Sequence, residues 1–98
     1  MITIYEKEKA EDMAEELVEH RLAGCVQIIG PIESFYSWDD DLQQSEEYLC
    51  VAKSEGRLYP ELERTVKDIH TYENPEIIVV PVIDGSEGYL SWLKDGLR

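Results

Sequence analysis

The sequence predicts an α+β fold, and three observations support that prediction. Two segments carry apolar residues at the spacing of an amphipathic helix. A long β-rich stretch ends in a run of aspartates and is followed by a second β-rich stretch, which is typical of a hairpin. The chain has 98 residues, the length of one domain, so residues 1–98 are expected to form a single domain.

The N-terminal part is predicted to form a short strand followed by a helix. Residues 2–5 alternate as a strand does, and Gly24 is placed to end the helix that follows. The helix has Glu and Asp on its solvent face, and its apolar face is formed by Ala10, Met13, Ala14, Leu17, Val18, Arg21 and Leu22.

The central part is predicted to form an unusually long hairpin. Cys25 to Trp38 reads as one strand bent at Gly30-Pro31, Asp39-Asp40-Asp41 as the turn, and Glu46 to Lys53 as the returning strand. A straight strand of this length reaches about 45 Å, at about 3.3 Å per residue. Two helices cannot cover such a ribbon, so its aromatic residues imply a partner chain: Phe35, Tyr36 and Trp38.

The C-terminal part is predicted to form a helix, a strand and a short helix. The second helix opens at Ser54-Glu55-Gly56, accepts Pro60 in its first turn, and ends at His70, where a protonated imidazole would favour the helix dipole. Its buried stripe is Leu58, Leu62, Val66 and Ile69. Ile77 to Ile83 is almost entirely apolar and is expected to be a strand covered on both faces. The final short helix holds Tyr89, Leu90, Trp92 and Leu93, with Tyr89 and Trp92 expected to anchor it.

The order of elements is therefore β-α-β-β-α-β with a short C-terminal helix. This order matches the ferredoxin-like plan, in which two helices cover one face of an antiparallel sheet.

Charge restricts the partners of the chain. It has 22 acidic and 9 basic residues, a net charge of −13. Such a surface repels nucleic acid and anionic membranes, favours solubility, and concentrates cations nearby. The first residues lack the basic start and long apolar core of a signal peptide, and no run of eighteen apolar residues occurs. The expected location is the cytoplasm.

The two cysteines are not expected to form a disulfide. If the turn is centred on Asp40, the numbers of two residues that face each other across the hairpin add up to about 80. Cys50 then faces Gly30, and Cys25 faces the strand end near Glu55. The thiols then lie on the order of 16 Å apart, whereas a disulfide needs Cα atoms within about 7 Å.

Three groups of residues are candidate sites. His70 and Glu76, near Tyr72, offer imidazole and carboxylate ligands suited to Cu²⁺ or Zn²⁺, and Cys25 is a further candidate ligand. The alternative is that His70 caps its helix and Tyr72 packs at a subunit boundary. Asp39-Asp40-Asp41 lacks the ligand spacing of a calcium loop and is expected to be a solvated turn. The expected inter-subunit cleft or interface residues are Phe35, Tyr36, Trp38, Lys53, Tyr72 and Trp92.

Several other functions lack their motifs. The first loop has no Cys-x-x-Cys for a metallochaperone, and Glu6-Lys7-Glu8-Lys9 offers no glycine-rich anion cradle. No aromatic-basic strand motif of an RNA-binding module is present. No Ser/His/Asp or Cys/His arrangement is indicated, so the chain is not expected to be an enzyme.

Five segments, in order, resemble the CutA family of divalent-cation-tolerance proteins: Glu19-His20-Arg21-Leu22-Ala23-Gly24-Cys25-Val26, Ser34-Phe35-Tyr36-Ser37-Trp38, Lys53, His70 to Ile77, and Tyr89-Leu90-Ser91-Trp92-Leu93. The resemblance implies a ferredoxin-like subunit and a tight homotrimer in which the long hairpins extend the sheets of neighbouring subunits. It also implies a role in tolerance of divalent metals, with copper as a ligand, and no catalytic activity. This sequence departs from the family pattern in its short first loop, without a cysteine after the first strand, and at Asp40 and Thr71, where the family has glycine and proline.

Three functional hypotheses follow. The first is a cytosolic homotrimer associated with tolerance of divalent metals, with Cu²⁺ as the expected ion. The second is a trimeric signalling protein that binds a small anionic metabolite in inter-subunit clefts through Lys53, Tyr36 and Trp38, by analogy of fold. The third is an enzyme whose site forms only between subunits.

Overall fold

The computed structural model describes all 98 residues and has the predicted α+β architecture. The elements, in order, are β1 (Ile2–Ile4), α1 (Lys7–Glu19), β2 (Cys25–Trp38), β3 (Asp41–Lys53), a short 3₁₀ helix (Gly56–Leu58), α2 (Tyr59–Ile69) and α3 (Glu87–Gly96). None of these helices is both long enough and apolar enough to cross a membrane.

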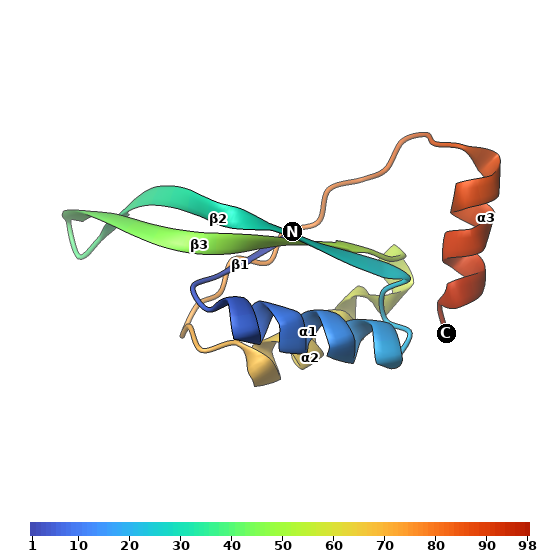
Figure 1. The fold of residues 1–98 in the computed structure, drawn as a ribbon, viewed down its shortest axis with the longest axis horizontal. Coiled ribbons are helices and arrows are strands. Elements are labelled where there is room, and N and C mark those ends of the chain that lie inside the picture. The colour runs from blue at the N-terminus through green and yellow to red at the C-terminus, as the bar shows by residue number, and fades with distance from the viewer.

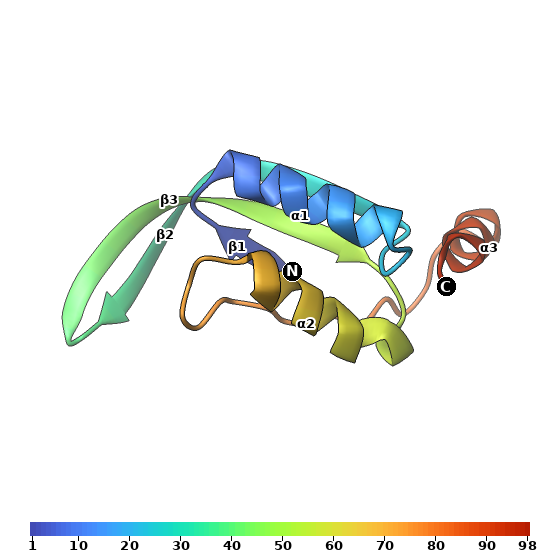
Figure 2. The ribbon, with the colours of Figure 1, turned by 90° about the horizontal axis from the view of Figure 1, so that it is seen from below.

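The strands form one antiparallel sheet with the order β1-β3-β2. Helices α1 and α2 lie side by side under one face of this sheet, whereas the hairpin of β2 and β3 projects well beyond them (Figures 1 and 2). The chain is 46 Å long in its longest dimension for that reason. Its hydrophobic core lies between the helices and the base of the sheet and is built from Ile2, Ile4, Ala10, Met13, Leu17, Leu22, Ala23, Cys50, Leu58, Leu62, Val66 and Leu97.

Helix α1 ends differently from the prediction. Arg21, not Gly24, takes the left-handed backbone conformation after the helix, with φ of 56°. The Arg21 side chain donates hydrogen bonds to the carbonyl oxygens of Asp95, Gly96 and Leu97 at the end of α3. Gly24 is required for packing instead, because a Cβ atom there would lie 2.5 Å from Cδ1 of Leu93.

The hairpin turn was predicted correctly, with a small difference in register. Trp38 pairs with Asp41, so only Asp39 and Asp40 form the turn, and both have positive φ, as a type I′ turn requires. Strand β3 therefore begins at Asp41 and not at Glu46. The predicted bend at Gly30-Pro31 is confirmed by a register shift between Ile29 and Ile32.

The position of the turn, between Asp39 and Asp40, and the extra residue of β2 at the bend each shift the partners of the cysteines by one residue. Cys50 pairs with Ile28 instead of Gly30, and Cys25 pairs with Lys53. Both thiols are free, as predicted, and burial raises the pKa of the Cys50 thiol.

The prediction of a last main strand at residues 77–83 was wrong for the single chain. Ile77 makes one isolated bridge with Ile2, and Met1 and Ile78 exchange two hydrogen bonds. Beyond them the segment makes no backbone hydrogen bond, because β1 is too short to pair with it. Far from being covered on both faces, the apolar side chains of residues 79–83 are exposed, and Ile83 is 94% exposed.

Helix α3 is present as predicted, but its anchors are not the predicted ones. Leu93 and Leu97 are buried, while Trp92 is 57% exposed and stacks on Tyr89 with ring centroids 5.7 Å apart. Leucines at the inner face, together with the hydrogen bonds from Arg21, hold α3 to the rest of the chain.

Candidate functional site

An open cavity lies where the outer half of the hairpin meets the end of β1 and the loop after α2. We call it the hairpin cavity. It is open, has a volume of about 750 Å³, and is lined by Thr3, Tyr5, Ser34, Phe35, Tyr36, Trp38, Gln43, Glu47, Tyr72, Glu73, Asn74 and Glu76. The long hairpin and the return of the chain at Asn74-Pro75 bring these distant segments together.

Hydroxyl groups connect two walls of the hairpin cavity. The Tyr5 and Tyr36 hydroxyl groups lie 3.0 Å apart, and the Ser45 hydroxyl donates to Tyr36 Oη at 3.4 Å. The hydrogen bond from Ser45 lowers the pKa of Tyr36, and the hydrogen bond with Tyr36 raises the pKa of Tyr5. The outer hairpin is thereby tied to β1 by polar contacts.

The best-buried charge of the chain lies on the floor of this cavity. Glu47 is only 6% exposed, and its Oε2 accepts a hydrogen bond of 2.8 Å from the Tyr72 hydroxyl. Burial, then this hydrogen bond, raises the pKa of Tyr72 far above its ordinary value. Tyr72 therefore stays protonated and donates to the carboxylate at any ordinary pH.

His70 is held by two hydrogen bonds next to this pair. Nδ1 accepts from the Tyr72 backbone N–H at 3.1 Å, and Nε2 lies 2.7 Å from the Thr3 carbonyl oxygen. A nitrogen that accepts carries no proton, so the ring is neutral with its proton on Nε2, donated to Thr3. The expected favourable interaction of a protonated His70 with the dipole of α2 is therefore not what holds the ring.

The three candidate metal ligands are not brought together within one chain. His70 lies beside Thr3, which is level with Leu49 and Ile29 in the sheet. Cys25 lies four residues further along β2, a displacement of about 13 Å in the strand direction alone, and β3 separates β2 from β1. Glu76 lines the hairpin cavity. No group of three or more His, Cys, Asp or Glu side chains in the chain is arranged to hold a metal ion.

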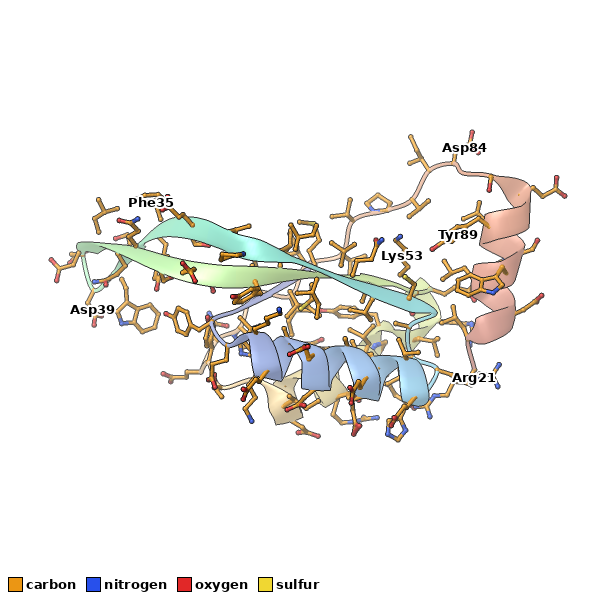
Figure 3. The ribbon with its side chains drawn as sticks, viewed as in Figure 1. Arg21, Phe35, Asp39, Lys53, Asp84 and Tyr89 are labelled. Atoms are coloured by element: carbon orange, nitrogen blue, oxygen red, sulfur yellow. The ribbon has the colours of Figure 1, made fainter.

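A second cavity lies at the opposite end of the molecule. We call it the strand–helix cavity. It has a volume of about 500 Å³, is mostly apolar, and lies between the end of β3, residues 77–85 and α3. Lys53 lines it, with Nζ 5.6 Å from the centre of the Tyr89 ring. Figure 3 shows Lys53 and Tyr89 facing each other, far from Phe35 and Asp39 at the tip of the hairpin.

The predicted interface residues therefore divide between two places. Phe35, Tyr36, Trp38 and Tyr72 line the hairpin cavity, and Lys53 lines the strand–helix cavity. Trp92 is exposed on α3. A single chain does not bring Lys53 together with Tyr36 and Trp38.

Sequence reasoning missed Tyr5, Glu47 and Arg21. Glu47 looked like one more acidic residue of a strand, since its burial depends on Tyr72 from a distant loop. Arg21 was assigned to the apolar face of α1, but it reaches α3. The only available signal was its place directly after a helix, next to the Leu-Ala-Gly sequence.

The fold defines a class of small ferredoxin-like α+β proteins with a long hairpin. The family model of the CutA1 divalent ion tolerance protein matches residues 1–96, and the chain belongs to this family. The divalent-cation tolerance protein CutA of Thermus thermophilus is 37% identical over 95 residues, covering 97% of this chain and 92% of that protein.

Solved structures give the same result for the fold. The structure of the divalent cation tolerance protein from Thermus thermophilus superposes with a TM-score of 0.96 at 36% identity, covering 99% of this chain and 94% of that one. The predicted ferredoxin-like fold is thereby confirmed. The chloroplastic CutA protein of Arabidopsis thaliana is 36% identical over 97 residues, and this chain spans 53% of its length.

Proposed function

We propose that the protein is a cytosolic homotrimer that binds ligands without catalysis and contributes to tolerance of divalent metal ions, copper among them. Membership of the divalent ion tolerance family supports the metal role. The observation that carries the trimer is the exposed apolar segment of residues 79–83, which makes no backbone hydrogen bond within the chain.

One unpaired strand edge and one extended segment without backbone hydrogen bonds flank the strand–helix cavity. Strand β1 pairs with β3 only from Tyr48 to Cys50, so residues 51–53 lack a neighbour on that side. Val79 and Val80 line the same cavity from the opposite side. Unpaired edges attract strands from other chains. The outer hairpin of another copy supplies such a strand, and its exposed aromatic side chains would be buried in the contact.

Light scattering on the purified protein tests the trimer. The expected mass is about three times the 11.3 kDa of one chain. Ile83→Lys places a charge on the exposed apolar segment and is expected to shift the mass towards that of one chain. Val18→Lys is the matched control, because Val18 is an exposed apolar residue on α1, away from both cavities. A wild-type protein that stays monomeric at micromolar concentration contradicts the proposal.

The metal ligands in this proposal are His70, Glu76 and Cys25. Because Cys25 is remote from His70 within a chain, the ligands come from more than one subunit, and metal binding requires His70 to give up its bond to Thr3. Calorimetric titration with Cu²⁺ and with Zn²⁺ tests this, using His70→Ala and, as control, His20→Ala at the exposed histidine. Binding that is lost only in His70→Ala supports the site, whereas unchanged affinity removes His70 from it.

The second candidate function, binding of a small anionic metabolite, is favoured by one observation. Lys53 is the sole basic side chain lining the strand–helix cavity, and it forms no ion pair within the chain. Titration with citrate and with ATP, on wild type and Lys53→Met, tests this candidate; Lys94→Met on the exposed side of α3 is the control. Equal binding by both variants counts against it.

The cytoplasmic location is part of the proposal as well. The plant relative carries the word chloroplastic in its name, so location differs among relatives. Cell fractionation with compartment markers decides the point, and recovery outside the cytoplasmic fraction contradicts it.

A further inference from the structure

Arg21 caps the C-terminal end of α3 from a distant part of the chain. Its guanidinium group donates hydrogen bonds to the carbonyl oxygens of Asp95, Gly96 and Leu97, at 3.0 to 3.1 Å. The last carbonyl groups of a helix have no partner within the helix, and the helix dipole favours a positive charge beside them. The backbone of Arg21 is left-handed, which is uncommon for a residue with a Cβ atom, and its carbonyl oxygen accepts from the Arg98 N–H. Arg21 is therefore the polar anchor of α3.

The apolar anchors of α3 lie at the same end of the helix. Leu93 packs closely on Gly24, and Leu97, directly after the helix, is buried in the core. Nearer the start of the helix, Tyr89 is 40% exposed and Trp92 is 57% exposed. The position of α3 is therefore set mainly at its C-terminal end, where Arg21 lies.

The exposed apolar segment of residues 79–83 lies between two fixed points. On one side, Ile78 exchanges two hydrogen bonds with Met1. On the other side, the Ser86 hydroxyl accepts from the Tyr89 N–H at 3.3 Å and so caps the start of α3. Figure 1 shows this segment as a long connection from the sheet to α3. Because the segment makes no backbone hydrogen bond of its own, the position of α3 decides where its far end lies.

Helix α3 also forms one wall of the strand–helix cavity, through Tyr89, Leu90 and Leu93. The trimer proposed above places a strand of another copy between the edge of β3 and residues 79–83, next to this wall. Arg21 does not line the cavity. Figure 3 shows it at the C-terminal end of α3, whereas Asp84 lies near the opposite end. Any influence of Arg21 on the contact between copies must therefore pass through α3.

We propose that Arg21 is a positioning residue for assembly of the trimer. By fixing the C-terminal end of α3, it places both the wall of the strand–helix cavity and the far end of residues 79–83 for the neighbouring copy. Arginine suits this role because its planar group presents several N–H donors in a fixed geometry, whereas lysine offers a single point charge. The role of Arg21 rests on the proposed trimer.

Subunit exchange in the full chain measures this effect. Trimers labelled with ¹⁵N are mixed with unlabelled trimers, and native mass spectrometry follows the mixed trimers at a temperature where wild type exchanges within a day. Arg21→Gly removes the guanidinium group, while glycine adopts the left-handed conformation without strain, so the end of α1 is retained. We expect mixed trimers to form at least tenfold faster than in wild type.

Two further variants complete the exchange experiment. Arg64→Met removes an equal charge from the exposed face of α2, and we expect less than a twofold change. Arg21→Lys retains the charge but not the planar group, and we expect a rate between those of wild type and Arg21→Gly. If Arg21→Gly does not fold, the comparison of Arg21→Lys with wild type decides the role, and equal rates overturn it.

Hydrogen exchange of backbone amides separates positioning from a general loss of stability. In Arg21→Gly we expect the amides of α3 to exchange at least tenfold faster, while those of α1 and α2 stay within twofold of wild type. Equal acceleration in all three helices shows that Arg21 only stabilises the fold, and this result overturns the positioning role.

The outcomes distinguish the role of Arg21 from the trimer itself. A wild-type protein that is monomeric overturns both. A trimeric wild type whose Arg21→Gly variant forms mixed trimers at the wild-type rate overturns the role of Arg21 and leaves the trimer standing.

Discussion

The two halves of the sheet differ in what covers them. The half formed by β1 and the base of the hairpin packs against α1 and α2, and its inner side chains are buried. The outer half of the hairpin has no helix beneath it, and Leu42 near its tip is 78% exposed. One half is therefore stabilised by the chain itself, whereas the other is held by backbone pairing and by polar contacts at the hairpin cavity.

The largest test of this comparison is a pair of leucine truncations. Leu17 in α1 is fully buried, so Leu17→Ala is expected to lower the free energy of unfolding by about 2–5 kcal/mol. Leu42→Ala removes the same atoms from an exposed position and is expected to change it by about 0.5 kcal/mol or less. Urea unfolding measures both values. A large cost for Leu42→Ala shows that another copy covers the hairpin, and the cost should then depend on protein concentration.

An intermediate effect is expected at the junction between the halves. Tyr72→Phe leaves the buried Glu47 without its donor, which costs about 1–3 kcal/mol for a buried polar group that loses its partner. Chemical unfolding near neutral pH measures this cost, and Tyr59→Phe on α2 is a control that leaves the Glu47 contact intact. A variant as stable as wild type indicates that water or a cation satisfies the carboxylate.

The same tyrosine predicts a pH dependence. In the folded chain the pKa of Tyr72 lies above its ordinary value of 10.0, so the unfolded chain releases this proton first. The stabilisation is complete below pH 10 and declines as pH rises further, because only the unfolded state gains charge. Tyr72→Phe should lose less stability than wild type above pH 10. Parallel curves for the two proteins contradict the assignment.

The smallest effect is expected at the tip of the hairpin. Asp39 and Asp40 both have positive φ, which costs most residues about 1 kcal/mol or more, though less for Asp, and nothing for glycine. Asp40→Gly forms the favoured Asp-Gly turn and is expected to raise stability by up to about 1 kcal/mol. Asp41→Gly, within β3, is the control and should lower stability. Thermal unfolding measures both, and a destabilising Asp40→Gly contradicts the turn type.

Local signals in the sequence predicted most of the elements. The apolar spacing of α1 and α2, the glycine-proline bend in β2 and the aspartate turn are each written in consecutive residues, and the structure has all of them. The failures occurred where a distant segment decides the outcome. Residues 77–83 look like a buried strand, but their only partner within the chain is the edge of a three-residue β1.

The candidate sites show the same limit. The sequence pointed to Tyr36, Trp38 and Tyr72, and all three line the hairpin cavity. It did not identify Glu47, because nothing in the sequence distinguishes a buried glutamate of a strand from an exposed one. The burial becomes evident only when the residue that covers the carboxylate is known. The sequence also predicted one shared site for Lys53, Tyr36 and Trp38, although within a chain the length of the hairpin separates Lys53 from the two aromatic residues.

The sequence by itself determined the α+β class, the family resemblance, the free thiols and the strong negative charge, since these depend on composition, periodicity and short motifs. Only the tertiary structure decided that Arg21 holds α3, that His70 uses both ring nitrogens, and that Glu47 is buried among tyrosines without a positive partner. The physical reason is that burial, and with it the energy of a charge or a hydrogen bond, is set by the segments that fold over a residue, and these lie far from it in the chain.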